Sequence, residues 1–135
     1  MACFLVSAAE AAVVKAVEKH EEKVEAQAAV SESAVNEAEV EPKIPMSRKL
    51  KWLTRLLIGG AVLLAFEHVW HGEVVPWFPF LTAMSDPADT AEMLHEMATV
   101  GVSMAVLITA VWFVMCKVAD ALVKKPVVEP EKTIA

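Results

Sequence analysis

Lysine and arginine flank two apolar stretches of the chain on the same side. Neither residue occurs between Arg55 and Lys117. Within that interval Met97–Cys116 gives twenty residues without a charge, which is the length that an α-helix needs to cross a bilayer. Leu56–Phe66 is a second uncharged run, of eleven residues. This pattern predicts an all-α membrane protein, and the alternative is a pair of helices buried in a soluble core.

The expected fold is a membrane helical hairpin of two transmembrane helices over residues 46–125. The spans are placed at about 52–71 and 97–116, with an outer loop at 72–86. The basic clusters flank both spans on one side, and cytoplasmic loops carry an excess of lysine and arginine. We therefore expect a multi-pass protein of the inner or plasma membrane, with both termini cytoplasmic and an acidic outer cap.

Local signals place the helix ends. Ser47 is expected to cap the first helix after the break at Pro45, and Asp86 is expected to cap the second, with Pro87 in its first turn.

The first span is short. Its eleven uncharged residues are too few to cross a membrane alone. They become sufficient when Trp52–Arg55 and Glu67–His71 are included, because the arginine side chain can reach the interface.

The outer loop combines prolines with aromatic side chains. Pro76 and Pro79 prevent a regular helix, and Trp77, Phe78 and Phe80 favour the headgroup zone of a membrane. The loop is therefore expected to lie in the outer interface, or to form a hydrophobic docking surface for a partner subunit.

The N-terminal segment, residues 1–45, is rich in alanine, valine and glutamate, and is predicted to be helical or flexible. A stripe of small residues recurs with an eleven-residue period on one helical face. Two alternatives stay open: an amphipathic helix on the membrane or on a partner, anchored by Phe4 and Leu5, and a partly disordered, solvated acidic segment. The stripe of small residues in the N-terminal segment comprises Val6, Val13, Val17, Val24, Ala28 and Val35.

At the other end of the chain, residues 126–135 are expected to be a disordered tail.

Glutamates and histidines gather where each span meets the outer interface. The pair Glu92-x-x-His95 has the spacing by which helical bundles present a carboxylate and an imidazole to one metal. A homodimer would supply two such pairs, with Glu67 as the additional carboxylate. A transition metal or haem is therefore one hypothesis, and pairing of these groups with one another in a wet interface is the simpler one. The candidate ligands are Glu67, His68, His71, Glu92, His95 and Glu96.

Small residues predict where helices approach one another. Gly60 lies below Glu67 and His71 on the first helix, so the polar faces of the two helices are expected to meet there. Ala98, Gly101 and Ala105 lie roughly opposite the polar face of the second helix, and would then be free for a second copy of the chain.

Composition excludes several classes of function. The net charge of −6 and the absence of a large basic patch argue against nucleic acid as a partner. No nucleophile with a positioned base and no phosphate loop occurs, so an enzyme is not expected. Cys3 and Cys116 are far apart and are interpreted as small buried hydrophobic residues rather than a disulfide.

The segment EHVWHGEVVPWFPFLTAMSDPADTAEMLHEMATVGVSMAVL, together with the start MACFLV, resembles a group of small bacterial membrane proteins with two spans. The resemblance covers roughly residues 46–120 and the first few residues. It implies a bacterial membrane hairpin and carries no activity, cofactor or site residue.

Three functions are consistent with these features. The first is a non-enzymatic membrane protein that acts as an oligomerising or accessory subunit, with the lipid bilayer and a membrane protein as partners. The second is a metal- or haem-binding membrane protein. The third is a small pore or holin-like protein, in which Thr99 and Ser103 would face the lumen.

Overall fold

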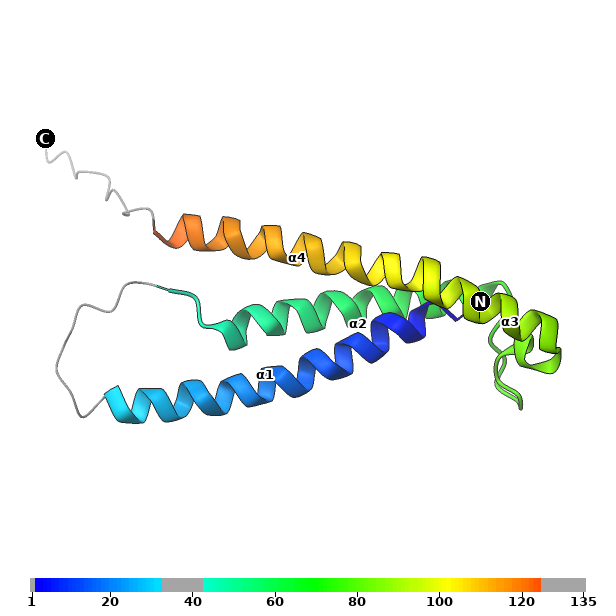
Figure 1. The fold of residues 1–135 in the computed structure, drawn as a ribbon, viewed down its shortest axis with the longest axis horizontal. Helices are drawn as coiled ribbons and strands as arrows, with labels where there is room; N and C mark the ends of the chain where they lie inside the picture. Colours follow the sequence, from blue (N-terminus) through cyan, green and yellow to red (C-terminus); the bar gives the residue numbers. More distant parts are fainter. Residues whose placement is uncertain (1, 33–42, 125–135) are drawn as a thin grey trace, which may run out of the picture.

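The computed structural model describes residues 2–32 and 43–124, and in these ranges the secondary structure is helical (Figure 1). The predicted all-α fold class, with two helices apolar and long enough to span a membrane and an N-terminal helical segment, is confirmed. The predicted tail at 126–135 and Val35 lie outside the described residues. The elements are α1 (Phe4–Glu32), α2 (Met46–Trp70), η1 (Thr82–Ser85), α3 (Pro87–Glu96), η2 (Met97–Gly101) and α4 (Val102–Val123).

The second apolar segment is one long helix that runs through α3, η2 and α4, over 37 residues. The sequence signal at its start is confirmed: Asp86 lies just before the helix, and its Oδ1 accepts a hydrogen bond from the backbone nitrogen of Ala88 at 2.7 Å. Pro87 is the first helical residue. The η2 turn is a π-helical turn inside this helix, so the helix is locally wider there.

The prediction that Ser47 caps α2 is wrong. The helix begins two residues earlier than that cap implies, at Met46, and Pro45 precedes it without a side-chain cap. The cap comes instead from Glu25 of α1. Its Oε1 accepts from the backbone nitrogen of Ser47 at 3.1 Å, and its Oε2 accepts from the Ser47 hydroxyl at 2.6 Å. A carboxylate is favourable here because a helix N-terminus carries a partial positive charge.

Helix α1 packs along α2 and runs in the opposite direction, and α4 contacts both of these helices (Figure 1). At the centre Ala11 is buried with Leu53 and Leu57, with Ile108 and Trp112 against them. The start of α1 therefore lies at the opposite end of the bundle from the end of α4 (Figure 1). From the sequence, α1 was expected either to lie on the membrane or on a partner, or to be a solvated segment. In the structure α1 packs against α2 and α4 of its own chain.

Apart from Val6, which packs against Gly101, the valine stripe predicted for α1 is not its packing face. Val13, Val17 and Val24 are exposed, whereas Ser7 and Glu18 are buried on the face that meets α2. The reason is electrostatic. The acidic side chains of α1 have partners on α2, and turning the valines inward would move those carboxylates away from them.

The small-residue stripe of the second helix is occupied by α1 and is not free for a second copy. Gly101 and Ala105 are buried, while Ala98 is exposed. A Cβ at Gly101 would lie 2.8 Å from Cγ2 of Val6, so the absence of a side chain permits the close approach of α1. The expected approach at Gly60 is present, since a Cβ there would lie 3.1 Å from Cδ1 of Ile108 on α4.

The loop after α2 folds into a short hairpin. Val75 donates its backbone N–H to the carbonyl of Phe80 at 2.8 Å, and Val74 pairs with Leu81 in an isolated bridge. The tip exposes Trp77 and Phe78, which are 66% and 85% accessible. The aromatic side chains that were predicted to face a membrane interface or a partner are therefore on the surface of the chain.

Candidate functional site

The predicted ligand set does not converge on one point. His68 is buried, and its Nδ1 lies 2.6 Å from the carbonyl of Leu64. His71 is exposed, and its Nδ1 lies 2.9 Å from the carbonyl of Glu67. A carbonyl only accepts, so in both rings the Nδ1–H donates to the helix backbone.

Glu92 and His95 are exposed, so the pair with metal-ligand spacing faces away from α2. The buried side chain of α3 is Met93, which packs with Ala2 and Ala83. This packing turns the neighbouring Glu92 outward. Among residues 2–32 and 43–124 no three His, Cys, Asp or Glu side chains lie close enough to hold a metal ion.

Three of the six candidates, His68 among them, line one small cavity of about 270 Å³ at the end of the bundle where α2 ends. Its polar lining consists of Glu67, His68 and Glu96, with Glu73 and Cys3 added. His68 Nε2 lies 3.8 Å from the nearer carboxylate oxygen of Glu73. Glu73 and Cys3 were not among the residues predicted for this site. Glu73 reaches the site through the turn at Gly72, which has a φ of +73°, and Cys3 reaches it only because α1 packs here.

At the opposite end of the bundle, acidic residues of α1 contact residues in the first turns of α2. Lys51 forms an ion pair with Glu22 at 2.5 Å. Glu18 is 1% exposed, and accepts from Lys15 Nζ at 2.8 Å and from the hydroxyl of Thr54 at 3.1 Å. These interactions fix the register of α1 on α2.

These contacts also shift the titration of α1. Hydrogen bonds from Ser47 lower the pKa of Glu25 against a smaller, opposing effect of burial. The Glu25 carboxylate therefore binds protons less readily than a free glutamate.

The attachment of α1 is expected to weaken in acid. A carboxyl with a lowered pKa in the folded state stabilises fully above the ordinary glutamate pKa, and that stability is lost as the pH falls through the lowered pKa. Glu25→Gln should cost about 1 kcal/mol at pH 6 and flatten the loss of stability between pH 6 and pH 3. Thermal unfolding in detergent, followed by circular dichroism at each pH, measures this. Glu21→Gln is the control on the same helix, and equal curves for both variants would contradict the role of Glu25.

Helix α4 is tied to α2 at the same end. Lys49 is buried, and its Nζ lies 2.7 Å from Oδ2 of Asp120. The indole nitrogen of Trp112 donates to the carbonyl of Lys49 at 2.7 Å. Toward the middle of the bundle, the hydroxyl of Thr109 donates to Oε1 of Glu10 at 2.7 Å, which links α4 to α1.

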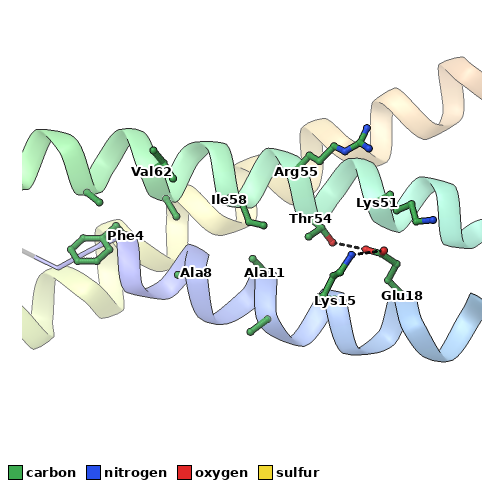
Figure 2. Close-up of a pocket in the computed structure, with 13 residues that line it drawn as sticks. Phe4, Ala8, Ala11, Lys15, Glu18, Lys51, Thr54, Arg55, Ile58 and Val62 are labelled. Carbon is green, nitrogen blue, oxygen red and sulfur yellow. Dashed lines mark hydrogen bonds and ion pairs between the residues drawn. The ribbon is translucent and has the colours of Figure 1, made fainter.

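An apolar groove of about 730 Å³ runs between α1 and α2 (Figure 2). Figure 2 shows Phe4 and Val62 toward one end and the charged side chains toward the other. Small side chains on α1 leave the space open. The groove is lined by Phe4, Ala8, Ala11, Ala12, Lys15, Glu18, Lys51, Thr54, Arg55, Ile58, Ala61, Val62 and Ala65.

Comparison of the chain with protein-family models, curated proteins and solved structures yielded no match. Its function is therefore inferred from its own residues and their geometry.

Proposed function

We propose that this chain is a non-enzymatic integral membrane protein that acts as an accessory or oligomerising subunit. The observation that carries the proposal is the exposure of its apolar helices. Only 28% of the apolar stretch of α2 and 17% of that of α3–α4 is buried. The core helix of a soluble protein is mostly buried, so these side chains require another apolar environment, and lipid together with partner helices provides it.

The outward face of α4 supports this assignment. Its exposed side chains include Val106, Leu107, Val111, Phe113 and Val114. Two exposed hydroxyls of the same long helix are satisfied locally, because Thr99 donates to the carbonyl of His95 at 2.8 Å and Ser103 to that of Thr99 at 2.6 Å. A hydroxyl bonded to its own helix needs no water, so it tolerates lipid.

The orientation proposed from the structure differs from the sequence expectation at one terminus. The basic end of α2 and α4 is placed in the cytoplasm, which also places the end of α4 there. Because α1 runs antiparallel to α2, the same arrangement places Ala2 and Phe4 near the outer surface, where Phe4 contacts the His68 ring with centroids 5.6 Å apart. The proposed topology is therefore N-terminus outside and C-terminus inside, with the polar half of α1 at the cytoplasmic surface.

Neither alternative function gains a supporting observation. The metal hypothesis required Glu92 and His95 beside Glu67, and the two α3 side chains are exposed on another face. The pore hypothesis required Thr99 and Ser103 to offer their hydroxyls to water, and both already donate to the backbone. The accessory subunit accounts for the exposed apolar faces without either requirement.

Membrane integration is expected to resist alkaline carbonate. The full-length chain should remain with the membrane pellet, because its exposed apolar surface has no aqueous alternative. Release into the supernatant would overturn the proposal.

The topology is tested with epitope tags. A protease-accessible epitope tag before Met1 should be cleaved in intact cells stripped of any outer barrier, whereas a tag after Ala135 should be protected. Protection of both tags would restore the two-cytoplasmic-termini topology.

The subunit role is tested separately in native membranes. Photo-crosslinking from Phe113, which is 55% exposed on α4, is expected to capture a second copy or a partner helix. Crosslinking from buried Leu57 in the bundle interior is the control and should capture neither. If the chain is integrated in the membrane but no protein is crosslinked from Phe113, it is a membrane protein without a partner subunit. That result would contradict this part of the proposal.

A further inference from the structure

The groove between α1 and α2 combines an apolar floor with a cationic end. Lys15, Lys51 and Arg55 line that end together with one acid, Glu18. Lys15 is paired with Glu18 and Lys51 with Glu22. In the part of the chain that the structure describes, no acidic side chain pairs with Arg55. The groove therefore ends in one positive charge that the bundle does not neutralise.

The part of the groove beyond Arg55 matches the depth of one leaflet of a bilayer. On α2 the lining runs from Lys51 to Ala65, about 21 Å at a rise of 1.5 Å per residue, and Arg55 and Ala65 are about 15 Å apart. Half of a hydrocarbon core of about 30 Å has the same length as this second distance. In the proposed orientation the cationic end lies at the cytoplasmic surface, and the groove continues past Val62 toward Phe4, on the side of the outer surface.

The groove is too narrow for a helix. A volume of about 730 Å³ spread over about 21 Å gives a cross-section of roughly 35 Å². An α-helix about 10–12 Å in diameter needs more than twice that area. A flexible hydrocarbon chain can fill such a space, since the lining is mostly alanine, isoleucine and valine side chains (Figure 2).

We propose that this groove binds an anionic phospholipid of the cytoplasmic leaflet, with an acyl chain against Ala8, Ile58 and Val62 and the phosphate at Arg55. The guanidinium suits the phosphate because it donates several N–H groups in a planar fork. Glu18 does not repel the phosphate strongly, because Lys15 and Thr54 already neutralise and hold its carboxylate. This inference rests on the proposed membrane location.

Native mass spectrometry of the full-length protein in detergent tests the site, with phosphatidylglycerol and phosphatidylcholine of the same chain length as probes. We expect one phosphatidylglycerol per chain, bound about tenfold more tightly than phosphatidylcholine. Arg55→Gln should weaken phosphatidylglycerol binding about fivefold and phosphatidylcholine binding less, because choline already balances the charge of its phosphate. Arg48→Gln, which changes a cation outside the groove on the same helix, should have little effect.

A second pair of variants locates the acyl chain, because Arg55 also borders a smaller cavity of about 360 Å³ between α2 and α4. Ala8 is exposed along the groove, so Ala8→Phe should fill it and abolish binding of both lipids. Ala119→Phe in the smaller cavity should leave binding intact. Equal affinity for the two lipids, insensitivity to Ala8→Phe, or a second protein copy in place of lipid would overturn the inference. Membrane integration resistant to carbonate in the same preparation would show that only the lipid site had failed.

Discussion

Replacing Asp120 with leucine is expected to lower the free energy of unfolding by about 3 kcal/mol. The change strands the Lys49 ammonium, whose side chain is 8% exposed and whose ion-pair partner is Asp120. Removing one member of a buried pair leaves an uncompensated charge, which costs far more than the pair contributes. Lys117 and Lys124 also lie near Asp120, so the variant leaves several positive charges together.

The complementary variants distinguish this cause from a general loss of packing. Lys49→Met should cost less, about 1–2 kcal/mol, because Asp120 is 32% exposed and water can solvate it when it is unpaired. Combining Lys49→Met with Asp120→Leu should recover much of the stability, since neither charge is then buried alone. A double variant as unstable as the sum of the two single variants would contradict the pairing.

Cys116 reports on this end of the bundle. It is 7% exposed and lies one helical turn before Asp120. In a Cys3→Ala background, Asp120→Leu should accelerate thiol labelling of Cys116 about a hundredfold, because an opening made easier by about 3 kcal/mol is populated that much more often. Labelling at the wild-type rate would mean that the pair does not hold α4 to α2.

Gly101→Ala is expected to loosen the other end of α1 by about 1–3 kcal/mol. The added Cβ would lie 2.8 Å from Cγ2 of Val6 and 3.3 Å from the carbonyl oxygen of Cys3. The valine is branched at Cβ and cannot move away freely, so the helices must separate. Alanine is otherwise the better helix former by about 1 kcal/mol, so a net loss isolates the steric effect.

Gly59→Ala is the matched control, because nothing lies within 4 Å of a Cβ placed there. It should leave stability unchanged or raise it by up to about 1 kcal/mol. Cys3, which is 6% exposed beside Gly101, is the local reporter in a Cys116→Ala background. Faster labelling of Cys3 is expected for Gly101→Ala and not for Gly59→Ala. Equal labelling in the two variants would show that α1 does not depend on the close approach.

The candidate site could be predicted only in part. The sequence indicated that Glu67, His68 and Glu96 lie at the same end of the bundle, and they line one cavity. It also paired Glu92 and His95 with them, because helical spacing alone does not say which face is buried. Met93 takes the buried position on α3, and the two predicted ligands are consequently exposed.

The groove was not visible in the sequence. Its walls come from residues of α1 and α2 that are far apart in the sequence. In the sequence, the alanines that line it indicate only a preference for helix. Its single unpaired cation becomes apparent only when the partners of Lys15 and Lys51 are known.

The sequence by itself determined the existence of the helices and one helix start. The uncharged run at 97–116 and the Asp86-Pro87 signal are local features, since they depend on residues within a few turns. Only the tertiary structure decided how α1 packs, because its contacts join residues far apart in the chain, such as Glu10 with Thr109. Hydrophobic periodicity favoured the valine face of α1, and the ion pairs and hydrogen bonds of Glu18, Glu22 and Glu25 selected another.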